Sequence, residues 1–456
     1  MTPVLTVDEM QAVDASAPEP LEVLVGRAGF AVARAALAML GGGYGRRVVV
    51  LAGPGNNGDD GRHAGALLRR RGVRTIEVDA TAAPAHLPAC DLVIDAAFGT
   101  GLSRPFEAPD PGGTPVLAID IPSGVRGDDG QLLGRPMPAT RTVTFAALKP
   151  GLLFGDGPHF VGEIELADIG LDASRATIHV VDDRGAAAMV PVRNRSAHKW
   201  DAAVLLVAGS AGMPGAAAMA AEAAQRAGAG MVVIAPPGVQ DRIGPVESVT
   251  AALPESGWAE AILDGAAADL ERIDALVIGP GLGTAMSTRH EIRELVRRAP
   301  VPLVVDGDAL TAVGADAGDL VGQRHHTTVL TPHDGEFARL AGGPPGHDRV
   351  AAARALAADA EAVVLLKGPS TVVARPDGAV RVVTSGDERL ATAGTGDVLA
   401  GTIAALLAGG ASGFDAASAG AHVHGVAGSR CPDPGTVASD VIRALPGALA
   451  QIGAGA

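Results

Sequence analysis

The strongest constraint on the fold is a series of short, almost wholly apolar runs that recur along the chain between alanine-rich stretches. The first part contains such runs, for example "RVVVLAG", at 47–53, 74–79, 91–96, 115–120 and 142–147. The second part repeats them at 203–209, 231–236, 275–280, 302–307, 327–332 and 362–368. Strands that are apolar on both faces must be covered on both faces, as in a parallel sheet with helices on each side. The sequence therefore predicts an α/β fold with doubly wound sheets.

The length and one polar stretch predict two domains. A chain of 456 residues has room for two or three. The most polar connection is "VVDDRGAAAMVPVRNRSAHKW", and we place the boundary near residue 190. This gives a Rossmann-like domain over 1–190 and a second α/β domain over 191–456. Near the end, "TVVARPDGAVRVVT" predicts a hairpin, because Pro-Asp-Gly joins two strand-like runs.

Composition narrows the class of protein. Aromatic residues make up only 2%, so the core must consist of Ala, Val, Leu and Ile. Cys90 and Cys431 are too few for a disulfide framework or a zinc site, which fits a reducing cytoplasm. A net charge of −15 argues against nucleic acid as a partner. No signal peptide or membrane-spanning run is evident. We expect a soluble cytoplasmic enzyme.

In the second domain, several glycine-rich or polar loops follow the predicted strands, where open α/β sheets bind ligands. These loops cover 209–217, 279–283, 306–310, 331–336, 367–371 and 393–401. Each has a simpler explanation by itself. Gly-Pro-Gly can be a bare turn, Lys367 can be a solvated charge, and Asp397 can be an ordinary helix N-cap. Together the loops indicate a site that handles phosphate.

The motifs "ALVIGPGLG", "VLTPHDGEFARL", "VVLLKGPSTVV" and "ATAGTGDVLAG" resemble those of the ribokinase-like ADP/ATP-dependent NAD(P)H-hydrate dehydratases, and the resemblance covers about residues 195–450. It implies that a nucleotide phosphorylates the C6 hydroxyl of hydrated NADH or NADPH. Loss of phosphate then restores the ring double bond. The stretch "DGDAL" departs from the family's usual Asp-Ala-Asp-Ala-Leu, so Asp306 is not assigned a role.

The resemblance also implies roles for individual residues. Backbone N–H groups of Gly394 to Asp397 would form an anion hole at a helix N-terminus, and Asp397 would be the general base, with its position favouring the ionised form. His333 is also explained by hydrogen bonding to its own loop. ADP or ATP, with magnesium, would bind at Lys367, Gly368, Pro369, Ser370, Thr371, Gly394 and Gly396. The hydrated dinucleotide would contact Ala216, Gly281, Gly283, His333 and Asp397.

In the first domain, three polar motifs come directly after predicted strands: "GPGNNGDDG" (53–61), "DAAFGTGLSRP" (95–105) and "IDIPSGV" (119–125). Asn-Asn-Gly is also a common tight turn. Together, however, the three motifs would place Asn57, Asp95 and Ser123 close to one another. These side chains offer the hard oxygen ligands that suit an alkali or alkaline-earth cation.

These motifs resemble the NAD(P)H-hydrate epimerases over roughly residues 1–180. The resemblance implies that Asn57, Asp95 and Ser123 bind a potassium ion and that Asp120 does acid/base work. The dinucleotide would contact the remaining motif residues, which are Asn56, Asn57, Gly58, Asp59, Asp60, Gly99, Thr100, Gly101, Leu102, Ser103, Arg104, Pro105 and Asp120.

Asp59 departs from the epimerase pattern, because the family has glycine there. We expect Asp59 to repel the substrate phosphates and to strain the backbone, and so to weaken epimerisation. The alternatives are that it points to solvent or adds a ligand to the cation.

The order of the two domains is that of bifunctional NAD(P)H-hydrate repair enzymes, in which the epimerase interconverts R and S hydrates and the dehydratase uses the S form. Two alternatives remain: a small-molecule kinase, and a first domain that only binds partners. The expected partners are small molecules, without nucleic acid or membrane. ADP against ATP, NADH against NADPH and the oligomeric state stay open, and a homo-oligomer is compatible with the sequence.

Overall fold

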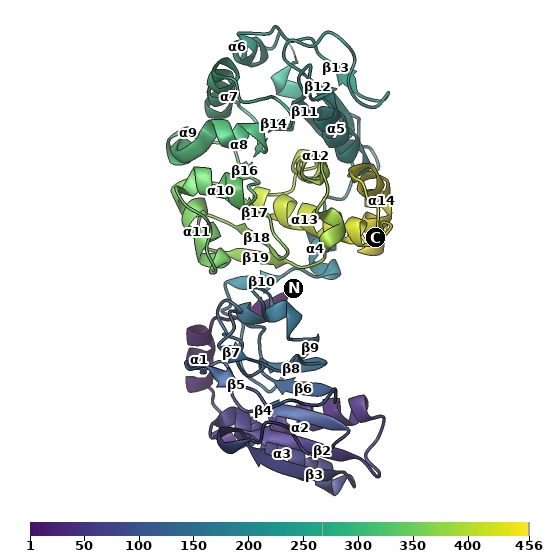
Figure 1. The fold of residues 1–456 in the computed structure, drawn as a ribbon. Helices are drawn as coiled ribbons and strands as arrows, with labels where there is room; N and C mark the ends of the chain where they lie inside the picture. The colour runs from purple at the N-terminus through teal and green to yellow at the C-terminus, as the bar shows by residue number, and fades with distance from the viewer. Residues whose placement is uncertain (267, 455–456) are drawn as a thin grey trace. The chain divides into compact units, whose positions relative to one another are not determined.

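The computed structural model describes residues 1–266 and 268–454, which form two compact units (Figure 1). The first unit is Thr2–Ile178, and the second is His179–Ala456 together with Met1. The sequence-based boundary near residue 190 lies just after helix α4 (Asp183–Met189). In the structure, α4 is therefore part of the second unit.

The first unit has one main sheet. Its helices are α1 (Val7–Ala15), α2 (Leu21–Leu40) and α3 (Asn56–Arg70). Its strands are β1 (Thr2–Val4), β2 (Arg47–Ala52), β3 (Arg74–Asp79), β4 (Leu92–Ala96), β5 (Phe106–Glu107), β6 (Val116–Ile119), β7 (Gly134–Arg135), β8 (Arg141–Phe145) and β9 (Glu163–Ala167). The five predicted strands correspond to β2, β3, β4, β6 and β8.

The main sheet is parallel, in the order β3-β2-β4-β6-β8-β9. Helices α2 and α3 cover one face, where they pack on side chains such as Val50 and Ile94. The other face is covered mainly by residues outside helices, among them Phe106 of the short strand β5 and Met137 of a loop, where the sequence predicts helices. In the described part of the chain, α2 is the one helix with the length and apolar composition of a membrane span, and half of it is buried.

The second unit is larger. Its helices are α4 (Asp183–Met189), α5 (Pro214–Arg226), α6 (Trp258–Leu263), α7 (Met286–Arg298), α8 (Asp308–Val313), α9 (Ala317–Val321), α10 (Asp334–Ala341), α11 (Arg349–Asp359), α12 (Thr395–Ala408), α13 (Gly413–Ser429) and α14 (Ala438–Gln451). Its strands are β10 (Ile178–Val180), β11 (Ala203–Val207), β12 (Met231–Ile234), β13 (Val249–Thr250), β14 (Ala275–Ile278), β15 (Leu303–Val305), β16 (Thr328–Leu330), β17 (Val363–Leu366), β18 (Thr371–Ala374) and β19 (Val380–Val383).

The sheet of this unit runs β10-β19-β18-β17-β16-β15-β14-β11-β12-β13. It is parallel from β17 to β13, and β17, β18 and β19 form an antiparallel edge. The predicted hairpin is the pair β18 and β19. Neighbouring residues Leu205 and Leu206 point to opposite faces and both are fully buried, so both faces are covered, as predicted. The α/β fold with two layered domains is confirmed.

Helices α5 and α12 approach each other closely at Gly401. A Cβ added there would lie 2.1 Å from the backbone oxygen of Ala220, which is shorter than any van der Waals contact. Because α12 begins at the predicted phosphate loop and α5 begins at another predicted substrate loop, this approach fixes one loop relative to the other.

We expect Gly401→Ala to destabilise the second unit by about 1–3 kcal/mol, since the two helices must separate. Gly215→Ala is the matched control, because a Cβ at Gly215 on α5 meets no atom within 4 Å. Trp200 and Trp258, the two tryptophans, both lie in this unit, so denaturant unfolding followed by tryptophan fluorescence reports on it. Equal midpoints for both variants would contradict the packing argument.

Candidate active sites

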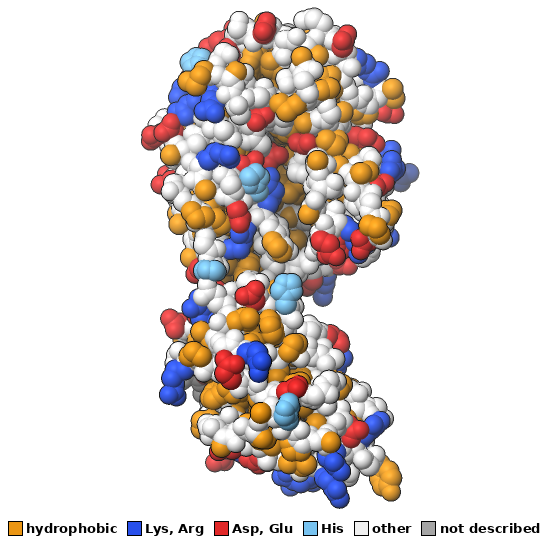
Figure 2. Space-filling model, in the orientation of Figure 1, with side chains coloured by type: hydrophobic (Ala, Val, Ile, Leu, Met, Phe, Trp, Pro, Cys, Tyr) orange, Lys and Arg blue, Asp and Glu red, His pale blue; other side chains and the backbone are white. Residues whose placement is uncertain are grey.

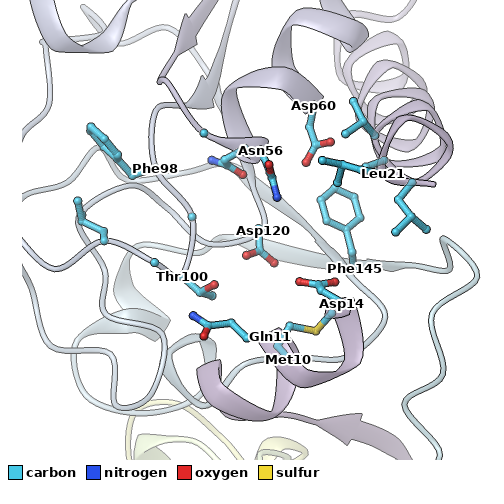
Figure 3. Close-up of a pocket in the computed structure, with 18 of the residues that line it drawn as sticks. Met10, Gln11, Asp14, Leu21, Asn56, Asp60, Phe98, Thr100, Asp120 and Phe145 are labelled. Atoms are coloured by element: carbon cyan, nitrogen blue, oxygen red, sulfur yellow. The ribbon is translucent and has the colours of Figure 1, made fainter. Parts of the chain in front are cut away.

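The first unit has a pocket of about 550 Å³ at the carboxyl ends of β2, β4 and β6 (Figure 3). The parallel strands end at the same edge, so the loops that follow them converge there. Most of the predicted substrate contacts line this pocket, namely Asn56, Asn57, Asp60, Gly99, Thr100, Gly101, Leu102, Ser103, Arg104 and Asp120.

Three predicted contacts, Gly58, Asp59 and Pro105, are not among the lining residues. The Asp59 side chain is 56% exposed and pairs with Arg62 at 3.1 Å. Asp59 is also not one of the described residues with a left-handed φ, so the expected backbone strain is not found. The alternative in which Asp59 points to solvent agrees with this geometry.

Asp120 lies at the base of the pocket in an unusual setting (Figure 3). Its φ is 66°, which is rare for a residue with a side chain and costs conformational energy that other contacts must offset. The Nζ atom of Lys149 lies 2.5 Å from Asp120 Oδ1, and the Lys149 side chain is only 1% exposed. The hydroxyl of Thr144 donates to the same oxygen at 3.2 Å. Asp120 is therefore held rigidly, beside a buried positive charge.

Three charged pocket residues, Asp14, Glu19 and Lys149, were missed in the sequence. Asp14 comes from α1 and Lys149 from the loop after β8. Lys149 also donates hydrogen bonds to the hydroxyl of Thr144 at 2.9 Å and to the carbonyl of Phe145 at 3.1 Å. Burial raises the pKa of Asp14; Lys149 lowers it and Asp120 raises it. Neither Asp14 nor Lys149 lies in a glycine-rich motif, and only the run "FAALKPG" after a strand could have indicated Lys149.

The three predicted cation ligands are only partly brought together. Asp95 is fully buried and accepts hydrogen bonds from the Ser123 hydroxyl at 2.6 Å and backbone N–H at 2.9 Å. Burial raises the pKa of Asp95, and no lysine or arginine among the described residues pairs with it. Asn57 has a buried side-chain nitrogen without a partner, and it has no hydrogen bond to the other two in the described part of the chain. A buried carboxylate without a counter-charge suits a monovalent cation. The orphaned atom of Asn57 is a hydrogen-bond donor, so it does not itself indicate a cation.

In the second unit, Asp397 lies in the first turn of α12. The N-cap is Gly394, in the left-handed region with φ 90°, and no described side chain caps this helix. Asp397 is therefore not the N-cap. Burial raises its pKa to about 6, Asp306 and Asp308 add to the rise, and Lys367 opposes it. The sequence-based expectation that the helix start favours the ionised form concerns only one of these influences, because burial and neighbouring carboxylates act in the opposite direction.

Lys367 links several carboxylates near this turn. Its Nζ atom lies 3.0 Å from Asp306 Oδ1 and 3.6 Å from Glu336 Oε2. Burial lowers the pKa of Lys367, but these two carboxylates outweigh burial and raise it. A Cβ on Gly396 would lie 3.7 Å from the same Nζ. Lys367 is thus not a solvated charge, and Asp306, which the sequence left without a role, is one of its closest partners.

Other predicted contacts lie around the same loops. A Cβ on Gly281 would approach that of Ala216 to 3.0 Å, and Gly283 N–H donates to Asp308 at 2.7 Å. His333 is the N-cap of α10, where its Nδ1 accepts from Gly335 N–H at 2.9 Å, as the structural alternative predicts. Its ring remains 57% exposed. Figure 2 shows acidic, basic and histidine side chains around a hollow on the visible face of this unit.

The predicted nucleotide loop runs from Lys367 at the end of β17 to Thr371 at the start of β18. The sequence missed Arg349 of α11, which donates to the Lys367 carbonyl at 2.7 Å and pairs with Asp334 at 2.8 Å. Its guanidinium lies against Gly368, where a Cβ would come within 2.7 Å. Arg349 of α11 thus contacts this loop at Lys367 and Gly368 and stabilises it.

Comparison with known proteins identifies both halves. A family model described as NAD(P)H-hydrate dehydratase matches residues 204–446. A model described as YjeF-related protein N-terminus matches residues 21–89 and 74–151. The chain is similar to an ADP/ATP-dependent NAD(P)H-hydrate dehydratase from Bacillus subtilis, co-crystallized with ATP/Mg²⁺, with 31% identity and a TM-score of 0.53 over 60% of this chain and 98% of that one. A ribokinase-like superfamily protein from Enterococcus faecalis, at 23% identity and a TM-score of 0.52, shares the fold over 60% of this chain and 96% of that one.

Relatives with the same two-domain length are also found. The chain is 36% identical to the bifunctional NAD(P)H-hydrate repair enzyme Nnr of Salinibacter ruber, over 98% of this chain and 96% of that protein. It is 38% identical to the enzyme of that name from Mycobacterium tuberculosis, over 91% and 90%. These matches span both units and agree with the resemblance of the motifs. The chain therefore belongs to the family of bifunctional NAD(P)H-hydrate repair enzymes.

Proposed function

We propose that this chain repairs hydrated NADH and NADPH: the first unit interconverts the R and S hydrates, and the second converts the S hydrate back to the reduced dinucleotide with ADP or ATP. The observation that carries the dehydratase half is Asp397 in an uncapped helix turn, beside Lys367 and Gly396. The epimerase half rests on the pocket around Asp120. Family membership supports both activities together.

In the dehydratase site, Asp397 takes the proton of the C6 hydroxyl, and the oxygen attacks the terminal phosphorus of the nucleotide. The bond from that phosphorus to the bridging oxygen breaks, and ADP leaves as AMP or ATP as ADP. With a pKa of about 6, Asp397 is about 90% ionised at pH 7 and so is ready to act as a base. Free N–H groups at the start of α12 and the ammonium of Lys367 stabilise the negative charge on the phosphoryl group. Magnesium would accompany the nucleotide phosphates. Phosphate then leaves C6 while C5 loses a proton, which restores the ring double bond.

In the epimerase unit, Asn57, Asp95 and Ser123 would hold a potassium ion. When bound, the ion supplies positive charge that offsets the buried Asp95 carboxylate and attracts the dinucleotide phosphates. Asp120, held by Lys149, exchanges a proton with the hydrate. The location we propose is the cytoplasm, since half of α2 is buried in the first unit, as in a core helix.

Racemic hydrated NADPH with ADP or ATP tests both halves in one assay. Recovery of the reduced nicotinamide absorbance should be rapid and complete, because the epimerase continuously resupplies the S form. Rapid recovery of only about half would contradict the epimerase assignment. No recovery would contradict the dehydratase assignment and favour a kinase for another small molecule.

We expect Asp397→Asn to reduce dehydration of the S hydrate by ~10²–10⁴-fold while it keeps nucleotide binding. In the wild type, kcat/KM for the S hydrate should rise with pH through about 6, because protonated Asp397 cannot accept the hydroxyl proton. Asp264→Asn, an exposed change in the same unit, is the control. Turnover of Asp397→Asn within a few-fold of wild type would rule out this residue as the base.

Asn57→Ala should slow conversion of R to S and leave dehydration of the S form unchanged, because each site lies within its own unit. Potassium chloride should also raise the melting temperature of the wild type more than sodium chloride does, as expected for a ligand of the folded state. This difference should vanish in Asn57→Ala and persist in Asp8→Asn, an exposed change on α1. An equal response of wild type and Asn57→Ala to potassium would contradict the ligand set.

A further inference from the structure

The pocket of the first unit contains a carboxyl group that differs from Asp120 in its surroundings. Asp60 projects from α3 into the pocket and is only 8% exposed (Figure 3). Within residues 1–266 and 268–454, neither a hydrogen-bond donor nor a cation pairs with its side chain. Asp120, in contrast, has Lys149 and Thr144. A buried carboxyl without a partner favours the protonated form, whereas an ion pair stabilises the carboxylate.

The other charged groups do not reverse this preference. Those that line the pocket or adjoin Asp60 are Asp14 of α1, Glu19 before α2, Asp59 of the same helix, Arg104 after β4, Asp120 after β6 and Lys149 after β8. Burial raises the pKa of Asp60 to about 8, and the carboxylates of Asp120, Asp59 and Asp14 add to the rise. The one buried lysine is already engaged by Asp120. At neutral pH Asp60 thus favours its protonated form, whereas Asp120 is paired with a buried lysine.

We propose that Asp60 is the proton donor of the epimerisation and works with Asp120 as the acceptor; this inference rests on the epimerase function proposed above. Figure 3 shows that Asp60 and Asp120 come from different elements and both face the pocket. A donor and an acceptor on separate elements suit a reaction in which a hydroxyl leaves one face of a ring and water adds to the other.

The chemistry balances with these two groups and water. Asp60 gives its proton to the C6 hydroxyl, and the C6–O bond breaks with its electron pair, so that water leaves. The lone pair of the ring nitrogen N1 forms an N1=C6 double bond, and the resulting cation is stabilised by the ionised carboxylates of the pocket. Water then adds to the opposite face of C6, the electron pair returns to N1, and Asp120 takes the proton. Proton exchange with solvent water then returns the proton to Asp60 and restores the Asp120 carboxylate for the next turnover. The reverse reaction uses the same steps with the two roles exchanged.

The test compares epimerisation by the full chain with Asp60→Asn, which keeps the size of the side chain and its ability to donate a hydrogen bond. We expect kcat for epimerisation to fall by ~10²-fold or more, with KM within a few-fold and dehydration of the S hydrate unchanged. In the wild type, kcat/KM for epimerisation should fall above about pH 8, when Asp60 ionises, and the variant should lose this alkaline limb. Asp8→Asn is the matched control and should behave as the wild type.

Epimerisation by Asp60→Asn within a few-fold of wild type would overturn the proposal, as would an alkaline limb that persists in the variant. A wild type that recovers only the S half of a racemic hydrate would overturn the epimerase function itself, which is a separate outcome. Should Asp60→Asn fail to fold, ¹³C NMR titration of the aspartate carboxyls in the wild type decides. A midpoint near 8 for Asp60 supports the proposal, and a midpoint below about 5 overturns it.

Discussion

Both units depend on one constraint: a strand buried on both faces can present polar residues only where it ends. In the first unit, all of β4 from Leu92 to Ala96 is fully buried, and the pocket loop follows directly. In the second unit, β14, β15, β16 and β17 are parallel, so their polar loops emerge at one edge. The direction of the strands therefore determines where each active site lies. The loops that carry the site residues could change without loss of the fold.

The same constraint concentrates acidic groups, and each site pairs one lysine with them. Lys149 pairs with Asp120, and Lys367 pairs with Asp306 and Glu336. A buried charge without a partner is costly, so each lysine stabilises the carboxylates that it contacts. The remaining carboxyl groups must bind a cation, as we propose for Asp95, or hold a proton.

The sequence predicted what lies in contiguous motifs and missed what lies between them. The central strands of both sheets and most residues of the pocket loops were predicted, because apolar runs and glycine-rich loops are local patterns. Asp14 and Lys149 were missed because they reach the pocket from α1 and from the loop after β8, without a motif of their own. Asp306 was not assigned a role because the glycine after it departs from the family's motif. Its contact is with Lys367, which lies 61 positions away in the sequence and so outside that motif. The charge states of Asp60 and Asp397 depend on burial, which no local pattern encodes.

Asp60 and Asp397 show how environment separates chemically identical side chains. Both are largely buried and both face other carboxylates, which raises the pKa in each case. The positive charge of Lys367 lowers the pKa of Asp397, which rises only to about 6. Lys149 is paired with Asp120 instead of Asp60, and the pKa of Asp60 rises to about 8. At pH 7 one is mainly a base and the other mainly an acid. Phosphorylation of a hydroxyl needs a base, and loss of a hydroxyl needs an acid. The position of one lysine in each site therefore gives the carboxyl group the protonation state that its proposed reaction needs.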